Sequence, residues 1–482
     1  MSLGLRIFKN TTYLTLGDKI GYLIQFLFFL YFARKFGVVP TGEYSFAFTF
    51  TFAFAVFADF GIAIYLVREV ARDYSSGRKL FFDCLVLRII FLSVIFVLAS
   101  IILAVSFRDI SPAKLRVIIC WGIYWVFYSL ADVFLAELNG HEKMGQVALL
   151  GLCLRLTATL AGVILIYLGF PYHVVLTVLP LSSSLYLCAS VLVSIYYLGK
   201  PKIEFRSFKH YRNLIRELLP FFFSVILVEL LWCQDILILG FIRDDQAVGI
   251  YSSALKIVAF ILGMSPFFHT AILPVLSRLF IESESQLIDL SNRILRYLIL
   301  GSLPMSIGLT MISDKIIRIL YSDIFYESTI VLQITSWTIT VGFIQAIYSV
   351  ILTAIDRQKE KVIFIGMNFL ISTLLNIILI YYFSYLGAAV VKLATTIIGL
   401  GFFIILVSRY LKYLPLFTSI IKPGFACLVM SIFIYYFASW NLIILIPTAA
   451  FIYLLSLFIL GVFTEQEIGF VKSCFPRTLY SR

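Results

Sequence analysis

Long apolar runs alternate with short polar segments along nearly the whole chain. About 20 consecutive apolar residues cross a bilayer as an α-helix, because each residue advances the helix by about 1.5 Å. The pattern predicts fourteen such spans, at residues 12–33, 43–66, 82–106, 116–138, 146–169, 173–198, 217–240, 248–275, 295–313, 328–354, 361–383, 387–408, 418–439 and 442–463. We therefore expect an all-α polytopic membrane protein.

A repeated motif predicts how these spans are grouped. Gly-x-Tyr-Ser-x-Ala occurs at residues 42–47 and again at 249–254, which is 207 positions later. An arginine follows each copy, and the two arginines are 210 positions apart. Repeats that enclose a substrate are a known transporter plan. We expect a six-helix lobe at 1–198, a basic cytoplasmic linker at 199–216, a second six-helix lobe at 217–410, and two additional helices with a cytoplasmic tail at 411–482.

Composition agrees with a membrane location. Hydrophobic residues make up 61% of the chain and charged residues 13%, with a mean hydropathy of +1.02. Soluble domains have about a quarter of their residues charged, so a soluble protein is excluded. The seven cysteines are scattered and form no CxxC motif, which indicates buried thiols rather than disulfides or metal ligands. We expect no metal and no cofactor.

The distribution of Lys and Arg predicts the orientation. If the N-terminus is inside, the cytoplasmic segments contain 25 of them and the outer loops contain 8. This bias places both termini in the cytoplasm and the protein in the cell (inner) membrane. The net charge of +12 then reflects cytoplasmic loops and anionic lipid, not nucleic-acid binding.

Several ionisable residues lie inside the predicted spans, where a charge costs about 2.5–3.5 kcal/mol on insertion scales. Glu229, Arg155 and Lys256 lie deepest, and they either line a polar cavity or form ion pairs between helices. Lys19, Asp59, Arg88 and Lys392 lie nearer span ends, where a side chain can reach the headgroups. Asp132 and Asp235 are intermediate. Because the charges balance, an anionic cargo, a cation and a proton relay all remain open.

One predicted span has an aromatic and polar face. Trp121, Trp125, Tyr128 and Asp132 recur at helical spacing. Such a stripe suits stacking against sugar rings, and it is equally typical of helix packing.

Short motifs along the chain resemble those of a known family. The N-terminal half contains Ala33-Arg34-x-Phe36-Gly37, the first Gly-x-Tyr-Ser-x-Ala copy, Ala58-Asp59-Phe60-Gly61 and Arg68-Glu69. The C-terminal half contains Gly249-x-Tyr251-x-x-Ala254-x-Lys256 and Leu273-Pro274-Val275-Leu276-Ser277-Arg278. This series resembles the oligosaccharide repeat-unit flippases of the multidrug/oligosaccharidyl-lipid/polysaccharide exporter superfamily, over most of residues 1–410.

The resemblance implies two six-helix lobes around a cavity that opens alternately to each side. The cargo would be a polyprenyl-diphosphate-linked oligosaccharide, moved from the inner to the outer leaflet for surface polysaccharides such as the O-antigen of lipopolysaccharide. In the related lipid II flippases, basic residues contact the diphosphate, one of them at about the place of Lys256. Their span-one arginines have no counterpart here, where Tyr22 and Phe28 stand nearest, which argues against a peptidoglycan precursor. The two extra helices would line a groove for the lipid tail.

We therefore expect Lys256 and Arg155 to bind the diphosphate, with Arg88 and Lys19 assisting from the cytoplasmic side. The candidates for carrying a coupling ion are Glu229, Asp59, Asp235 and Asp132. The expected partners are the lipid-linked oligosaccharide, membrane lipids, a polysaccharide polymerase and chain-length proteins. The protein is expected to be a monomer and not an enzyme.

Two other functions stay open. A multidrug cation antiporter of the same superfamily would use a site dominated by Glu229, Asp235 and Asp59, although fourteen spans count against it. A membrane polymerase or glycosyltransferase would need catalytic residues in a substantial outer loop. The predicted outer loops are short, and those at 169–173 and 384–387 contain no acidic residue.

Overall fold

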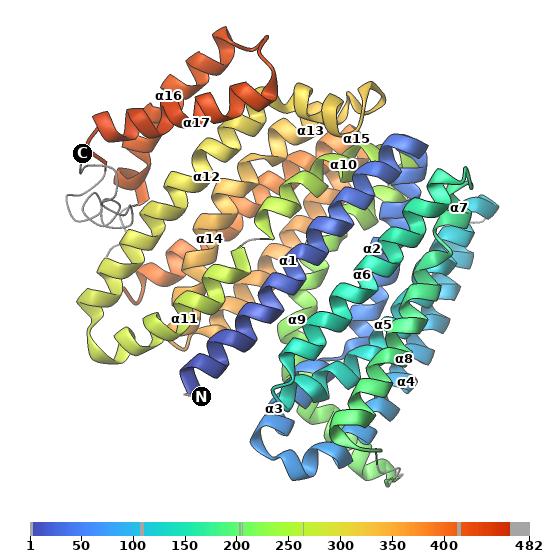
Figure 1. Ribbon diagram of the computed structural model, residues 1–482. Coiled ribbons are helices and arrows are strands. Elements are labelled where there is room, and N and C mark those ends of the chain that lie inside the picture. Colours follow the sequence, from blue (N-terminus) through green and yellow to red (C-terminus); the bar gives the residue numbers. More distant parts are fainter. Residues whose placement is uncertain are drawn as a thin grey trace, which may run out of the picture. The chain divides into compact units, whose positions relative to one another are not determined.

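The computed structural model describes residues 3–106, 110–201, 204, 206–263, 265–411 and 416–462, and the side chains of these residues except 3–16, 75–76, 106, 224, 265–271 and 416–418. Within these ranges the regular structure is helical and contains no strand (Figure 1). Twelve helical stretches there are long and apolar enough to cross a membrane. The prediction of an all-α polytopic membrane protein is confirmed.

The first half of the chain forms nine helices in the described ranges. They are α1 (Leu3–Phe36), α2 (Val38–Asp59), α3 (Ile62–Arg72), α4 (Tyr74–Ser106), α5 (Pro112–Gly140), α6 (Met144–Tyr167), α7 (Tyr172–Val175), α8 (Val178–Leu198) and α9 (Phe208–Ile242). The later elements are α10 (Asp245–Leu262), α11 (Ser265–Glu282), α12 (Glu284–Leu320), the 3₁₀ turn η1 (Asp323–Phe325), α13 (Ser328–Thr335), α14 (Trp337–Ala354), α15 (Gln358–Ser408), α16 (Leu416–Tyr436) and α17 (Leu442–Ile459).

Several predicted spans are divided by backbone breaks. The span predicted at 43–66 contains the end of α2 and the start of α3, separated by Phe60 (φ 49°) and Gly61 (φ 76°). A Cβ at position 61 would lie 2.6 Å from Cβ of Phe221, so both backbone angle and space favour glycine. The span predicted at 248–275 likewise contains α10 and the start of α11. Conversely, α15 contains two predicted spans, and Ser384 (φ 52°) breaks its geometry between them.

The helix boundaries repeat along the chain. Helix α2 begins at Val38 and α10 at Asp245, which are 207 positions apart. Helix α4 begins at Tyr74 and α12 at Glu284, which are 210 positions apart. In each half a membrane helix is followed by a second helix, α3 (11 residues) after α2 and α11 (18 residues) after α10. The repeat seen in the motifs thus extends to the elements that carry them.

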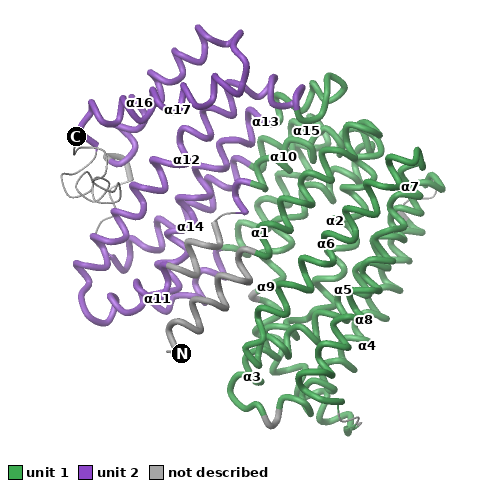
Figure 2. Tube along the Cα trace, viewed as in Figure 1, with its two compact units in different colours: residues 1–260, 320–331, 365–392 green, residues 261–319, 332–364, 393–482 purple. Residues whose placement is uncertain are grey.

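Contacts between residues divide the chain into two compact units (Figure 2). Unit 1 comprises residues 1–260, 320–331 and 365–392, and unit 2 comprises 261–319, 332–364 and 393–482. These units group segments by contact and not by chain order. The predicted lobes at 1–198 and 217–410 therefore remain a prediction, and the predicted tail after residue 462 lies outside the described residues.

Within unit 1, the two copies of the repeated motif contact each other. A Cβ at Gly42 of α2 would lie 1.7 Å from the backbone oxygen of Asp245, at the start of α10. A Cβ at Gly249 of α10 would lie 2.2 Å from the backbone oxygen of Val38. Real Cβ atoms cannot approach backbone so closely, so the glycines allow α2 and α10 to cross with their main chains in contact.

Unit 2 is held together by both polar and apolar contacts. The Ser306 hydroxyl lies 2.7 Å from that of Thr340, which links α12 to α14. The Tyr453 hydroxyl of α17 donates to the backbone oxygen of Leu300 in α12, at 2.9 Å. Helix α17 also packs along α16. The two C-terminal helices are thus anchored to α12 through a buried hydroxyl.

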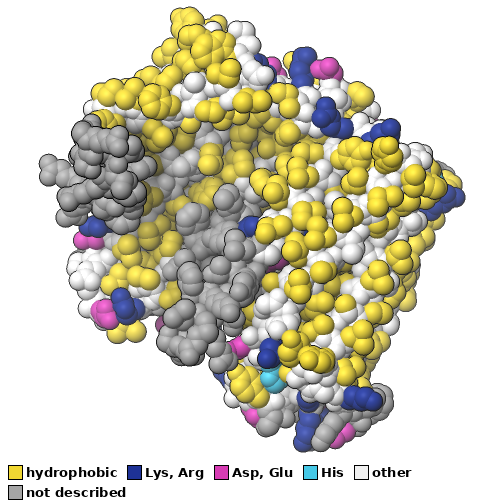
Figure 3. Space-filling view, in the orientation of Figure 1, with side chains coloured by type: hydrophobic (Ala, Val, Ile, Leu, Met, Phe, Trp, Pro, Cys, Tyr) yellow, Lys and Arg dark blue, Asp and Glu magenta, His cyan; other side chains and the backbone are white. Residues whose placement is uncertain are grey.

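The outer surface suits a lipid environment. On the face shown in Figure 3, hydrophobic side chains cover much of the helices, and Lys and Arg gather near their ends. Only 11% of the apolar window in Gly77–Val105 of α4 is buried inside the protein. Exposed aliphatic side chains over a whole helix are costly in water and favourable in hydrocarbon.

Candidate substrate-binding site

Lys256 is a membrane-embedded cation without a carboxylate partner in the described part of the chain. It lies on α10 between the buried side chains of Leu255 and Ile257. Its Nζ is 5.2 Å from the ring centroid of Phe29 on α1 and 5.7 Å from that of Phe48 on α2. Ring faces stabilise an ammonium by about 0.5–2 kcal/mol and do not cancel its charge. Lys256 can therefore attract an anion.

Aromatic rings continue from the Lys256 contacts into a pocket within unit 1. Phe29 lies 5.7 Å from Tyr44, and Phe48 lies 4.9 Å from Trp121, both measured between ring centroids. Tyr44 and Trp121 line a pocket with about 490 Å³ of empty space, which α1, α2, α5, α6 and α8 surround together with the segment after α7. The indole nitrogen of Trp121 is buried and has no hydrogen-bond partner among the described residues. The predicted aromatic face on residues 121–128 therefore includes a side chain that lines a pocket.

Arg155 of α6 lines the same pocket, in contact with α1. Its Nη1 donates to Oδ1 of Asp18 at 3.1 Å and to the Asp18 backbone oxygen at 3.2 Å. A Cβ at Gly21 would lie 2.4 Å from the Arg155 side chain, so the glycine leaves room for the guanidinium. The charge of Arg155 is thus partly compensated by a carboxylate, unlike that of Lys256.

Lys19 belongs to the Arg155 cluster. Its Nζ lies 5.7 Å from the ring centroid of Tyr22, and the guanidinium carbon of Arg155 lies 4.8 Å from the same ring. The structure therefore brings two of the four predicted substrate cations around one tyrosine. Lys256 contacts other rings, those of Phe29 and Phe48, so its aromatic neighbours differ from those of Arg155.

Arg88 is bound by carboxylates inside unit 1. Its side chain is 1% exposed, and its Nη2 lies 2.5 Å from Oδ1 of Asp59 and 3.3 Å from Oδ2 of Asp132. One guanidinium therefore joins α4 to α2 and α5. Because both carboxylates already neutralise Arg88, we leave it out of the substrate site proposed below. The arrangement has a formal charge of −1, so Asp59 and Asp132 stay candidates for ion coupling.

The other two predicted coupling carboxylates differ in their partners. Asp235 of α9 is buried and lies 3.1 Å from Nζ of Lys392, and it accepts a 2.6 Å hydrogen bond from the Tyr251 hydroxyl. Lys392 was expected to reach the headgroups, yet its ammonium is held in an ion pair. Glu229 is half-buried on α9 and has no ion pair or hydrogen bond within the described segments.

Sequence reasoning missed two polar contacts at the crossing of α2 and α10. Nζ of Lys114 lies 2.6 Å from Oδ1 of Asp245, and the Tyr172 hydroxyl donates to Glu43 at 2.7 Å. These residues lie at or beside the ends of predicted spans, where charged side chains are ordinary and do not by themselves indicate a site. Glu43 is nevertheless beside a motif glycine, and that position was a usable signal.

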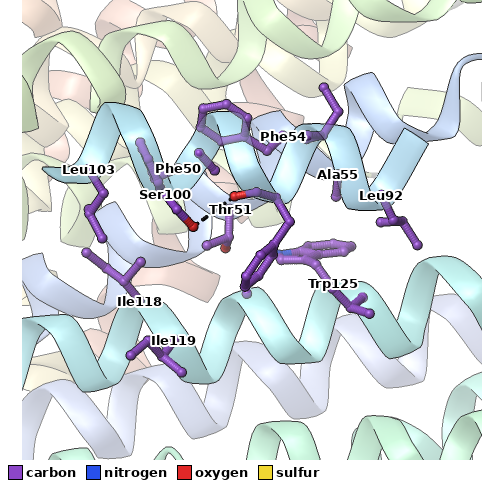
Figure 4. Close-up of a pocket in the computed structure, with 15 residues that line it drawn as sticks. Phe50, Thr51, Phe54, Ala55, Leu92, Ser100, Leu103, Ile118, Ile119 and Trp125 are labelled. Atoms are coloured by element: carbon purple, nitrogen blue, oxygen red, sulfur yellow. Dashed lines mark hydrogen bonds between the residues drawn. The ribbon is translucent and has the colours of Figure 1, made fainter. Parts of the chain in front are cut away.

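A separate apolar pocket lies among α2, α4 and α5, with about 620 Å³ of empty space (Figure 4). Phe50, Phe54 and Trp125 point toward it, with Ile118 and Leu103 on the opposite walls. The hydroxyl of Thr51 is already bonded to the backbone oxygen of Ala47. The side chains that line this pocket are mostly apolar and would bind a charged headgroup poorly, so the pocket is not part of the candidate site.

Comparison with known proteins now identifies the family. The sequence profile of the polysaccharide biosynthesis protein family matches residues 7–280, more than half of the chain. The chain belongs to this family. The matched region contains α1 to α10, and with them Lys256, Arg155 and both copies of the repeated motif.

Curated members of similar sequence have transport names. The chain is 23% identical over 394 residues to the probable low-salt glycan biosynthesis flippase Agl15 of Haloferax volcanii, covering 79% of each protein. It is 22% identical over 395 residues to the putative O-antigen transporter of Escherichia coli K12, covering 80% of this chain and 93% of that one.

Solved structures share the fold of this family member. The lipid II flippase MurJ in an inward closed conformation matches with a TM-score of 0.77 at 17% identity, covering 93% of this chain and 98% of that one. An inward-facing multidrug resistance MATE family transporter of the MOP superfamily matches with a TM-score of 0.66 at 14% identity, covering 81% and 95%. The chain thus shares its fold with a lipid II flippase and with a multidrug resistance transporter.

Proposed function

We propose that the protein is a flippase that moves a polyprenyl-diphosphate-linked oligosaccharide from the cytoplasmic to the outer leaflet for surface polysaccharide assembly. Membership of the polysaccharide biosynthesis family and the flippase and O-antigen transporter names of its relatives support this function. The observation that carries the mechanism is Lys256, an ammonium held by two aromatic rings and paired with no described carboxylate.

The chemistry of the cargo explains why such a lysine is useful. A diphosphate cannot cross about 30 Å of hydrocarbon unaided, whereas a polyprenyl chain dissolves there. Lys256 replaces part of the headgroup hydration with a charge-assisted hydrogen bond. Arg155 and Lys19, around Tyr22, form a second cationic position whose pairing with Asp18 weakens its hold on an anion. Weak, dispersed contacts allow the cargo to be released on the other side as the cavity alternates its access.

The expected protein partners are a polysaccharide polymerase and chain-length proteins, with the protein itself a monomer in the cell membrane. It acts without catalysis, since moving a lipid between leaflets breaks no covalent bond.

Replacement of Lys256 tests this function. In a strain lacking the gene, the Lys256→Met protein should restore no surface polysaccharide, and the lipid-linked precursor should accumulate on the cytoplasmic leaflet. Lys256→Arg should restore part of it because the charge remains. The matched control is Lys359→Met, an exposed lysine on α15, which should behave as wild type. Normal surface polysaccharide with Lys256→Met at wild-type abundance would refute the assignment.

A multidrug cation antiporter is the second candidate, because Glu229 on α9 is a carboxylate with no ion pair among the described residues and because the fold of a MATE transporter matches. Deletion of the gene should then sensitise cells to organic cations while leaving surface polysaccharide intact. The flippase function predicts the reverse pattern in the same two assays.

A further inference from the structure

The first half of α9 and the short helix α3 form one amphipathic surface on unit 1. Leu214 and Leu218 of α9 are buried in a core cluster that includes Leu66 of α3 and Phe81 of α4. Buried Asp83 of α4 lies 3.0 Å from Nε2 of His210. Residues 208–219, predicted as part of a linker and the start of a span, are therefore fixed against the protein by their apolar side.

The opposite side of these helices is strongly basic. Lys209, Arg212 and Arg216 are exposed and recur at the spacing of one helix face. Arg68 and Arg72 are exposed on α3 and share Glu69 as an ion-pair partner. Residues 62–72 and 208–219 together contain five cationic side chains and two carboxylates, the second being Glu217. We call the exposed side of these two segments the α3/α9 surface.

The carboxylates of this surface are already bonded. Glu69 binds both arginines of α3, and Glu217 accepts a 2.5 Å hydrogen bond from the Tyr65 hydroxyl. Lys209, Arg212 and Arg216 have no ion pair with any residue that the structure describes. Three adjacent cations on one helix face thus point into the surroundings without a counter-charge.

Apolar side chains lie beside these cations. Phe208 is 83% exposed and Leu219 is 36% exposed. Helix α9 contains 35 residues, and the apolar span predicted within it begins at residue 217. At about 1.5 Å per residue, residues 208–216 extend roughly 14 Å before that span. This segment therefore leads up to the membrane surface, where charged headgroups meet acyl chains.

We propose that the α3/α9 surface binds anionic phospholipid headgroups, with Lys209, Arg212 and Arg216 as the main ligands. Helices at membrane interfaces combine cations with exposed aromatic and aliphatic side chains. A soluble acidic partner would match the cations, whereas a membrane interface matches both the cations and the exposed Phe208. Each cation near an anionic membrane strengthens binding about fivefold. This property does not depend on the transported cargo, so it can be tested apart from the proposed function.

Amide hydrogen exchange of the full-length protein in nanodiscs tests the surface. Phosphatidylcholine discs are compared with discs that also contain phosphatidylglycerol. We expect exchange in residues 208–219 to slow several-fold when phosphatidylglycerol is present, and high salt to reverse the slowing. The variant K209Q/R212Q/R216Q should show no such slowing, whereas the charge-conserving K209R/R212K/R216K should keep it.

A matched control removes the same charge elsewhere. R278Q/R293Q/K359Q changes three exposed cations outside the α3/α9 surface and should respond to phosphatidylglycerol as wild type does. Equal exchange of wild type in both kinds of disc would overturn the proposal. So would an undiminished lipid effect in K209Q/R212Q/R216Q, or the same slowing by inorganic phosphate in phosphatidylcholine discs, which would indicate an anion site and not a lipid surface. Surface polysaccharide need not be measured, so failure here would leave the proposed function untouched.

Discussion

At the residue scale, the two membrane-embedded lysines Lys256 and Lys392 differ in their surroundings. Among the described residues Lys256 contacts aromatic rings and pairs with no carboxylate, whereas Lys392 is paired with buried Asp235 at 3.1 Å. Burying a charge without a partner is costly, so a protein keeps such a residue for function. A paired lysine can be kept for structure alone.

This difference predicts that replacing the two lysines changes the stability of the protein to different extents. Lys392→Met should destabilise the protein by about 3–5 kcal/mol, because Asp235 is left as an uncompensated buried charge. Lys256→Met should cost little or nothing, because it removes a charge without leaving one behind. Thermal unfolding in detergent, followed by size-exclusion chromatography, compares the two. A larger loss for Lys256→Met would contradict the assignment of roles.

Depth along the sequence singled out candidate residues and could not assign their partners. Counting from the span ends placed Lys256 and Arg155 deep in the membrane, and both lie in helices with aromatic contacts. The pairing of Lys392 with Asp235 depends on α15 lying beside α9, a tertiary contact that hydropathy does not encode. For the same reason Arg88 was expected to assist substrate binding, although Asp59 and Asp132 flank it.

At the element scale, the contact between α2 and α10 shows what the repeated glycines do. The motifs indicated two equivalent halves, but not that the halves touch at the motifs themselves. Gly42 and Gly249 permit this by placing no side chain between two main chains. The Lys114–Asp245 ion pair lies beside the same contact.

A methyl group at this crossing should therefore be poorly tolerated. Gly42→Ala or Gly249→Ala forces α2 away from α10, which should lower stability by about 1–3 kcal/mol and impair transport. Gly401→Ala on α15 is the control, since nothing lies near its added Cβ and alanine favours a helix. Apparent melting temperature and surface polysaccharide are the two measurements. Wild-type values for Gly42→Ala would show that the backbones are farther apart than described.

Hydropathy predicted the positions of the helices more accurately than the positions at which their backbone is broken. Predicted spans such as 116–138 and 146–169 coincide closely with α5 and α6. The ends of α2 and the interior of α15 depend on left-handed backbone at Phe60, Gly61 and Ser384. Phe60 and Ser384 are not residues that prefer this conformation, so only tertiary packing holds them there.

At the scale of the whole molecule, composition alone established the membrane class, and ordered motifs indicated the family. The apolar windows of twelve described stretches and the match to residues 7–280 confirm both. Orientation rests on the distribution of Lys and Arg.

The orientation gives a simple prediction. An even number of crossings with both termini in the cytoplasm means that a green fluorescent protein fused after Arg482 should fluoresce, whereas alkaline phosphatase at the same position should be inactive. A fusion in the segment between α4 and α5 should give the reverse result. Active phosphatase at the C-terminus would mean that the predicted topology is inverted. The α3/α9 surface would then face the leaflet opposite to the predicted one.

The ion pairs of Arg88 have a consequence for how the chain is synthesised. Helix α2 emerges from the ribosome first with Asp59, then α4 with Arg88, and α5 with Asp132 last. An isolated arginine in an inserting helix costs about 2.5–3.5 kcal/mol unless a partner is present. Asp59 is already there when α4 arrives, while Asp132 is not. Asp132, the more exposed of the two aspartates, therefore joins the cluster last. Asp59 is the partner that is available to Arg88 while α4 inserts into the bilayer.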